Sequence, residues 1–383
     1  MGKSTAARQM GSSNARQNQR YIVNWTFAEL DSKDWDEFER SHPDSQFLQG
    51  VQRLNKRRQM GYQSHIVGIK QGKEIIAGGV LLGRNNEFWM PYGPLIDWDN
   101  TELVHYFLKH IIDFSHEKGF VKIEIFPRVL LSIRDNKGTV LDSWDRSDLK
   151  QQFSAASFSY QGETVNYQMK AGRWAFVKDL SGIETVDQLR ASYRKTLRAR
   201  LRQTEGEVEM VALTRDELPT LIGLIDDSDE RNGVSGRELK YYQLMYDAFG
   251  DDIQFMVARK TDDHTPIAGA IFIRHGHEIS SYLSGMDRRY RHLNGRAWLQ
   301  DYMMTKYLGT DVTRVNFFWI EGRFSDNHLL EFKSGFGGVV EEYIGGFEKV
   351  LRPAHYHSKK LIQKGKRVAK KLINIPRRLR HRN

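Results

Sequence analysis

The side chain best placed for chemistry is that of Lys333, which stands in the run Phe332-Lys333-Ser334-Gly335-Phe336. A lysine in this apolar setting can hold a fixed positive charge beside an oxyanion that develops in a reaction. The alternative is a solvated lysine at a turn. The corresponding stretch in the first half of the chain, residues 153–158, has a serine where Lys333 would align. This asymmetry predicts one active site, formed mainly by the second half.

The composition excludes several other kinds of site. The 383 residues include no cysteine, so thiol nucleophiles, thiolate metal sites and disulfides are ruled out. The pairs His275/His277 and His355/His357 lack further clustered ligands, and we predict no metal site. Residues 2–5, Gly-Lys-Ser-Thr, imitate the end of a phosphate-binding loop, but no strand or upstream glycine precedes them. No apolar run reaches the ~20 residues of a membrane span, so we expect a soluble, cytoplasmic protein.

The elements that must position Lys333 occur twice in the chain. In each copy, two apolar runs joined by a polar turn are followed by a helical stretch that ends at a glycine. The matching runs are Ile66–Lys70 and Ile76–Val80 in the first copy, and Met256–Lys260 and Ile267–Ile271 in the second. A repeat of this length predicts two similar α/β lobes with a ligand-binding cleft between them.

We therefore divide the chain into two lobes and two tails. The predicted parts are a disordered basic tail at 1–20, a first lobe at 21–168, a second lobe at 169–352 that carries Lys333, and a basic amphipathic tail at 353–383. The net charge is +10, and residues 358–383 hold eleven Lys or Arg and no acid. This composition predicts a helix that contacts an anionic membrane. A frayed solubilising tail and an RNA contact are the alternatives.

The order of the predicted elements is typical of an N-acyltransferase fold of the GNAT type. In the first lobe the patterns predict strands at Tyr21–Trp25, 64–70, 75–82 and 87–92, and helices at 33–41, 49–61 and from Leu103 to Gly119. In the second lobe they predict helices at 185–203, 215–226 and 237–248, a strand at 207–213, and then the repeated strands and helix.

GNAT enzymes hold the pyrophosphate of CoA with a glycine-containing turn at a helix start. The matching turn of the second lobe, residues 292–297, keeps half of that pattern but begins with His in place of Arg or Gln. The first lobe has no glycine at this place, Thr101 to Val104. We therefore predict no intact CoA site, although a degenerate phosphate-binding helix start remains an alternative.

A set of motifs resembles the FemABX family, in family order over roughly residues 21–357. The motifs are Phe47-Leu48-Gln49, Tyr92 to Asp97, Glu102 to His105, Arg237 with Tyr241-Tyr242, Tyr282 with Gly285, Leu330 to Gly338, and Glu342 to Gly345. These enzymes use aminoacyl-tRNA to build peptidoglycan cross-bridges, and they consist of two GNAT-like lobes. Only residues 261–266 stand where some members carry a coiled-coil arm, so the chain resembles the armless form.

The resemblance implies roles for individual residues. It makes Lys333 the catalytic lysine, with Phe332 beside it, and it gives Asp97 the task of orienting or deprotonating the acceptor amine. For Asp97, a helix-start or turn position is the alternative. The implied substrate-binding residues are Arg57 (with Lys56 as the alternative) and Arg237 for the acceptor's pyrophosphate, and Tyr92, Tyr241 and Tyr282 for the peptide path. Each tyrosine alone also fits a core or cleft wall.

The resemblance implies an aminoacyltransferase that moves Gly, Ala or Ser from aminoacyl-tRNA to lipid II or UDP-MurNAc-pentapeptide, without a further cofactor. Arginines at four-residue spacing in 185–203, namely Arg190, Arg194, Arg198 and Arg202, fit tRNA phosphates or an ordinary solvated face. A CoA-dependent N-acetyltransferase is the leading alternative. A catalytically silent RNA- or membrane-binding module fits the tails but not the Phe332-Lys333 motif.

Overall fold

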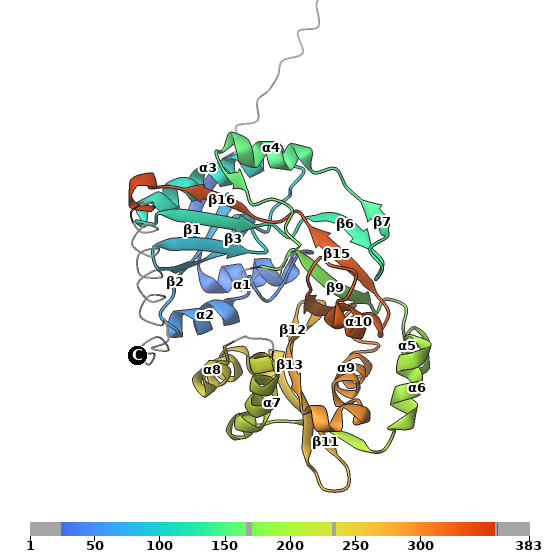
Figure 1. Cartoon of the computed structure of the whole chain (residues 1–383). Coiled ribbons are helices and arrows are strands. Elements are labelled where there is room, and N and C mark those ends of the chain that lie inside the picture. Colours follow the sequence, from blue (N-terminus) through green and yellow to red (C-terminus); the bar gives the residue numbers. More distant parts are fainter. Residues whose placement is uncertain (1–23, 166–170, 232–234, 357, 359–383) are drawn as a thin grey trace, which may run out of the picture.

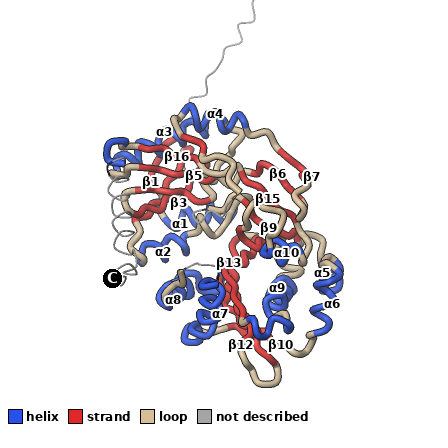
Figure 2. The backbone as a smooth tube through the Cα atoms, in the orientation of Figure 1, coloured by secondary structure: helices blue, strands red, loops and turns tan. Residues whose placement is uncertain are grey.

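The computed structural model describes residues 24–165, 171–231, 235–356 and 358. Within them the chain forms two β-sheets, with helices packed beside each (Figure 2). The first sheet lies at the upper left of Figure 1, and the second extends from β6 and β7 at the upper right down to β11. The predicted tail at 1–20 lies outside the described residues, and so does the basic segment after Ser358.

The first sheet has the order β1-β2-β3-β4-β5-β16-β8. Its strands are β1 (Trp25–Glu29), β2 (Gln63–Gln71), β3 (Glu74–Arg84), β4 (Glu87–Pro91), β5 (Lys122–Phe126), β8 (Ser159–Tyr160) and β16 (Phe347–Val350). Its helices are α1 (Ser32–Ser41), α2 (Val51–Gln59), α3 (Thr101–Glu117) and α4 (Ser147–Ala155). Neighbouring residues of β2 point to opposite faces: Ile66 packs with Trp35 of α1 and Leu54 of α2, and Val67 with Phe107 of α3. Helices therefore cover both faces.

The second sheet has the order β10-β11-β12-β13-β14-β9-β15-β6-β7. Its strands are β6 (Leu130–Arg134), β7 (Val140–Ser143), β9 (Trp174–Asp179), β10 (Val208–Ala212), β11 (Ile253–Lys260), β12 (Pro266–His275), β13 (Glu278–Met286), β14 (Arg314–Trp319) and β15 (Val339–Tyr343). The helices beside it are α5 (Val186–Ala191), α6 (Lys195–Gln203), α7 (Leu218–Arg231), α8 (Leu239–Phe249), α9 (Gly295–Lys306) and α10 (His328–Ser334), with 3-10 turns at Arg215–Glu217, Gly250–Asp252 and Arg288–Leu293. Met256 packs with α9 on one face, and Val257 packs with α7 on the other.

The sequence repeat corresponds to a repeated topology. The runs β1 to β4 and β10 to β13 are antiparallel, and each is followed by a parallel neighbour, β5 or β14. The two copies differ in the length of that parallel pair. β4 pairs with β5 from Glu87 to Pro91, whereas β13 pairs with β14 only from Glu278 to Ser280. In the second lobe the two strands therefore separate beyond Ser280.

The two sheets exchange strands, which a division at residues 168/169 does not anticipate. β6 and β7 precede that boundary but pair at the edge of the second sheet, beside β15. β16 follows the boundary but pairs with β5 and β8 of the first sheet. Each lobe is consequently completed by a segment from the other half of the chain.

One predicted helix is wrong in its extent. Residues 185–203 form two helices, α5 and α6, with a break at Ser192–Arg194. The Arg194 amide leaves the helical pattern because it donates to the carbonyl of Gly335, at 2.9 Å. Arg190 pairs instead with the buried Asp301, at 2.8 Å. The predicted line of four arginines is therefore not continuous.

Candidate active site

Lys333 lies near the end of α10, with its ammonium group against the end of β14. The residue is 7% exposed, and Nζ donates to the carbonyl oxygens of Phe318 (3.3 Å) and Trp319 (2.9 Å). Burial, together with the charge of Arg296, lowers the pKa of Lys333 to about 7. Near neutral pH the amine is thus divided between its charged and neutral forms, which is typical of groups at catalytic sites.

The carbonyl groups reach Lys333 because the backbone of β14 turns at a bulge between Asn316 and Trp319, where its register with β9 shifts. Phe318 has a φ of +65°, a left-handed conformation that costs a bulky residue energy. Its amide donates to Oδ1 of the buried Asn316 at 2.8 Å, and Asn316 Nδ2 donates to Oε1 of Glu278 at 3.0 Å. Buried hydrogen bonds therefore hold the strained turn that faces the lysine.

Arg296 is the second cation of this region. It lies in the first turn of α9, and its guanidinium group stacks over the ring of Phe332, 4.4 Å from the centroid. Phe332 in turn packs edge-on against Phe336. Sequence reasoning treated Arg296 only as part of a decayed CoA turn, and its position after Gly295 at a helix start was the available signal. The structure instead joins it to the Lys333 site.

Four further cations gather between α2 and α8: Arg53, Lys56 and Arg57 of α2, and Arg237, which precedes α8. Among the described residues, the carboxylate bonded to this cation cluster is Asp229, whose Oδ2 accepts from Arg237 at 3.1 Å. Lys56 is 2% exposed, and its Nζ lies 3.8 Å from the centroid of the Tyr241 ring. It forms no ion pair with any described residue. Such a concentration of positive charge is suited to an anion.

The ionisation of the cluster points the same way. Burial, with the charges of Arg57 and Arg53, lowers the pKa of Lys56 well below its ordinary value. Burial, with the charge of Arg57, lowers the pKa of Arg53 to about 9. A bound anion would oppose both effects because an opposite charge within a few ångströms favours the protonated form. Lys56 and Arg53 are thus placed to respond to a negatively charged ligand.

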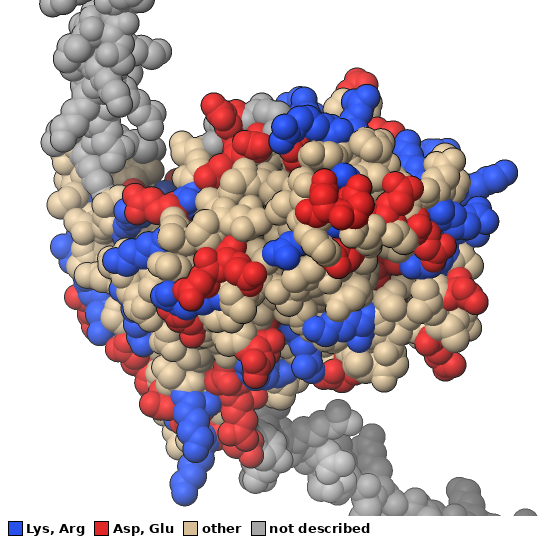
Figure 3. Space-filling view, turned by 90° about the horizontal axis from the view of Figure 1, so that it is seen from below, with Lys and Arg blue, Asp and Glu red and all other residues tan. Residues whose placement is uncertain are grey.

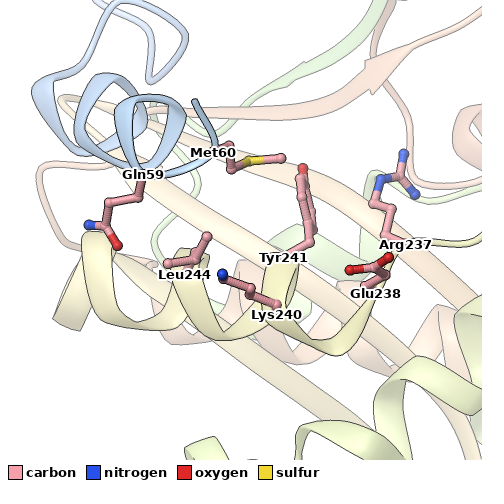
Figure 4. A pocket seen from close by; sticks show the side chains of 7 residues that line it. All are labelled: Gln59, Met60, Arg237, Glu238, Lys240, Tyr241 and Leu244. Atoms are coloured by element: carbon pink, nitrogen blue, oxygen red, sulfur yellow. The ribbon is translucent and has the colours of Figure 1, made fainter. Parts of the chain in front are cut away.

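A pocket with a volume of about 400 Å³ opens beside the cation cluster. Gln59 and Met60 line it from the end of α2, and Arg237 and Tyr241 line it from the side of α8. Figure 4 shows Tyr241 rising from α8 toward Met60, with Arg237 beside it. The pocket therefore lies at the junction of the two lobes, between α2 of the first lobe and α8 of the second.

A continuous line of contacts joins the cation cluster to Lys333. The hydroxyl groups of Tyr241 and Tyr282 are hydrogen-bonded at 2.7 Å. The Tyr282 ring packs edge-on against Phe318, with centroids 5.5 Å apart, and the Phe318 carbonyl accepts from Lys333. Six residues singled out from sequence thus lie along one region: Arg57, Arg237, Tyr241, Tyr282, Phe332 and Lys333. Arg53 was missed, although its spacing from Lys56 and Arg57 places it on the same face of α2.

Tyr92 and Asp97 occupy different settings. Tyr92 is 1% exposed at the lobe junction, where its hydroxyl donates to Gly172 O at 2.9 Å and accepts from Trp319 Nε1 at 2.7 Å. It forms the wall beneath the site. Asp97 is exposed in the turn before α3, where its Oδ1 accepts from the amide of Asp99 at 3.0 Å. That bond matches the turn position considered for Asp97 from sequence.

The described part of the chain contains no group of three metal-ligating side chains. His275 is hydrogen-bonded to Glu39 across the lobe junction at 2.6 Å, and His277 to the carbonyl of Asp311 at 2.8 Å. Within the same residues, no helix combines the length and apolar character needed to cross a membrane.

Known proteins share the sequence pattern and the fold of this chain. The model of the FemAB family matches residues 30–260 and 257–364. "Aminoacyltransferase FemA" of Staphylococcus aureus (strain bovine RF122 / ET3-1) is 23% identical, over 89% of this chain and 99% of its own length. The crystal structure of FemX superposes with a TM-score of 0.73 at 16% identity, covering 87% of this chain and 99% of FemX. A tandem GNAT protein from the clavulanic acid biosynthesis pathway has a TM-score of 0.52 at 10% identity, covering 86% and 99%. The predicted α/β fold of two tandem GNAT-like lobes is confirmed.

Proposed function

This chain belongs to the FemAB family, and we propose that it transfers an amino acid from aminoacyl-tRNA to the stem-peptide amine of a peptidoglycan precursor. The donated residue is glycine, alanine or serine. The acceptor is lipid II or UDP-MurNAc-pentapeptide, each of which carries a pyrophosphate. The reaction takes place in the cytoplasm and needs no metal and no cofactor besides the charged tRNA.

The reaction places specific demands on the site. The neutral acceptor amine attacks the ester carbonyl of aminoacyl-tRNA, a C–N bond forms, and the C–O bond to the tRNA ribose breaks. The proton that the amine loses ends on the departing ribose oxygen. Negative charge develops on the carbonyl oxygen before the ribose hydroxyl leaves. Lys333 supplies a positive charge at this point, and Arg296 strengthens the local positive potential. The ester is already activated, so alignment and charge stabilisation are sufficient.

The observation that carries this proposal is the line of contacts from the cation cluster to Lys333. It supports an acceptor whose pyrophosphate lies against Lys56, Arg57 and Arg237 while its peptide extends past Tyr241 and Tyr282. Lys56 and Arg57 both belong to the cluster, so the choice between them becomes a shared role. Asp97 as the group that orients the acceptor amine stays a prediction.

The test is transfer of labelled amino acids from charged tRNA to lipid II and, separately, to UDP-MurNAc-pentapeptide. We expect RNase-sensitive label on one acceptor, which identifies donor and acceptor together. Acetylation from acetyl-CoA, with no transfer from any charged tRNA, would overturn the proposal in favour of the N-acetyltransferase.

The basic segment at 358–383 is proposed to hold the enzyme at the inner face of an anionic membrane. Its alternation of apolar and basic residues in the sequence supports this. Deletion of 358–383 should abolish sedimentation with anionic liposomes, and unchanged sedimentation would contradict the role.

A further inference from the structure

The helix α6 carries a row of cations without counter-charges. Arg194, Lys195, Arg200 and Arg202 are exposed, and Arg198 is half-buried. None of the five forms an ion pair with a described residue. Several other arginines of the second lobe do so, for example the exposed Arg215 with Asp247 and the half-buried Arg274 with Asp311. The face of α6 therefore holds positive charge that the fold itself does not use.

Arg190 does not belong to this row. Its guanidinium donates to Asp301 at 2.8 Å and lies 3.8 Å from Glu205, so its charge is paired with carboxylates of the same chain. The opposite side of α6 is apolar, because Leu197 and Leu201 are buried in the core of the second lobe. Burial of one side and the absence of ion pairs on the other distinguish α6 from a solvated helix laced with salt bridges.

The row begins beside the helix that carries Lys333. The amide of Arg194 donates to Gly335 O at 2.9 Å, directly after α10 ends. From there α6 runs away toward Thr204, which accepts a hydrogen bond from Trp298 of α9. In Figure 1, α5 and α6 lie beside α9 and α10 at the right of the second sheet. Arg194, Arg198 and Arg202 thus follow one another at one-turn spacing, starting beside the end of α10.

The charge is local and does not form part of a general basic field. Figure 3 shows acidic and basic side chains interspersed on the face of the molecule seen from below. A flat anionic membrane would contact the surrounding surface, with its acidic side chains, as well as α6. A polyanion that is narrow and leads away from Lys333 fits the row better, and the acceptor arm of a tRNA has this form.

We infer that α6 binds the phosphates of the tRNA acceptor arm and thereby delivers the aminoacylated 3′ end to Lys333. This inference rests on the proposed function, which supplies aminoacyl-tRNA as the donor. The binding surface and its position next to α10 follow from the contacts of α6. Because phosphate contacts position an RNA without reading its sequence, α6 should serve every tRNA that carries the correct amino acid.

The first experiment measures binding of a fluorescent acceptor-arm RNA hairpin by anisotropy as salt is varied. Arg198→Glu/Arg202→Glu is compared with Arg215→Glu/Lys306→Glu, which makes the same charge change elsewhere on the second lobe. We expect at least ~10-fold weaker binding for the α6 variant only, and a salt slope smaller by about two, since each lost phosphate contact removes about one. Equal binding by both variants would overturn the inference.

The second experiment compares transfer from full aminoacyl-tRNA with transfer from an aminoacylated CpA dinucleotide, which is too short to reach along α6. The α6 variant should raise KM for tRNA while leaving the dinucleotide reaction unchanged. Equal losses on both donors would refute a role in tRNA delivery.

Failure of the proposed function has a different signature. Wild-type protein would then transfer from neither donor, and the hairpin measurement would still decide whether α6 binds RNA. Sedimentation with phosphatidylglycerol vesicles provides the remaining comparison. If the α6 charge reversal abolished vesicle binding and left hairpin binding intact, the surface would be a membrane contact and the inference would be wrong.

Discussion

Asn316 donates to Glu278 through Nδ2 at 3.0 Å, and this bond fixes which way the amide faces. Burial favours protonation of Glu278, but the charges of Arg128 and Arg314 outweigh it and lower its pKa to about 2. A carboxylate only accepts hydrogen bonds, so Asn316 must turn Nδ2 toward Glu278 and Oδ1 toward the amide of Phe318. Arg128 comes from the first half of the chain. The lobe junction thus determines the turn that holds Lys333.

Asn316→Asp should lower kcat by ~10–100-fold, because a carboxylate beside Glu278 would displace the turn that positions Lys333. The KM for the acceptor should change little, since the cation cluster is not touched. Steady-state transfer assays well below the melting temperature separate the two parameters. A loss confined to acceptor KM would contradict this positioning role.

Lys333→Met should reduce transfer by ~10²–10³-fold, the usual effect of removing a group that stabilises an oxyanion. In wild-type protein kcat/KM should also fall as pH rises through about 7, where Lys333 loses its proton. The guanidinium group of the Lys333→Arg variant stays charged at these pH values. The kcat/KM of this variant should therefore not fall as pH rises through about 7, even if the variant is slower than wild type. Dividing one pH profile by the other cancels the titration of the acceptor amine, and identical profiles would exclude a required charge on Lys333.

Lys333→Met, which should reduce activity, should increase the stability of the folded protein at low pH. The pKa of Lys333 is about 7 in the folded protein against 10.5 for an ordinary lysine, so the unfolded chain binds more protons between these values. The stability contribution of Lys333 therefore rises with pH across this window and is least favourable below pH 7. At pH 6, Lys333→Met should melt at a higher temperature than wild type, as measured by calorimetry. A lower melting temperature would show that the hydrogen bonds to Phe318 and Trp319 outweigh the cost of burial.

Lys56→Met should raise the acceptor KM by ~10–100-fold through loss of one charge-assisted contact to phosphate. Since burial lowers the pKa of Lys56, acceptor affinity in wild type should decrease as pH rises, and binding should be accompanied by proton uptake. Calorimetric titrations in buffers of different ionisation enthalpy measure that uptake. Arg58→Met, an exposed neighbour bonded to Ser64, is the matched control and should leave KM unchanged.

Arg190→Met should lower the melting temperature by a few degrees, because Asp301 is 2% exposed and would lose its cation while keeping the neutral Tyr193 hydroxyl as a donor. RNA binding should be unaffected. Adding Asp301→Leu should recover part of the loss, since the buried carboxylate that has lost its cation is then also replaced. If Arg190→Met bound RNA more weakly at a temperature where the variant is folded, Arg190 would have to be counted among the residues that contact tRNA.

The repeat and the element types could be predicted from sequence because both depend on local patterns. α3, for example, buries Leu103, Phe107 and Ile111 at helical spacing and is followed by Gly119 at a φ of +81°. The break in 185–203 could not be predicted, because it depends on a hydrogen bond to Gly335, far along the chain. The same holds for Arg190, whose partner Asp301 is equally remote in sequence.

Within the site, sequence motifs led to Lys333, Arg237, Tyr241 and Tyr282, since each stands in a recognisable run. They did not reveal that Lys56 is buried without an ion pair to any residue that the structure describes, or that Arg296 stacks on Phe332. Those properties arise where α2 meets α8 and where α9 meets α10. The residue pattern of a single segment does not predict such contacts between helices that are far apart in the sequence.

The exchange of β6, β7 and β16 limits how this architecture can be recombined. A chimera that joined the first half of one relative to the second half of another at 168/169 would leave β6 paired with a foreign β15, and β16 paired with a foreign β5 and β8. A workable hybrid must transplant 130–143 together with the second sheet and 347–350 together with the first. Changes of substrate preference within such chains are thus expected to arise through point substitutions more readily than through shuffling of whole lobes.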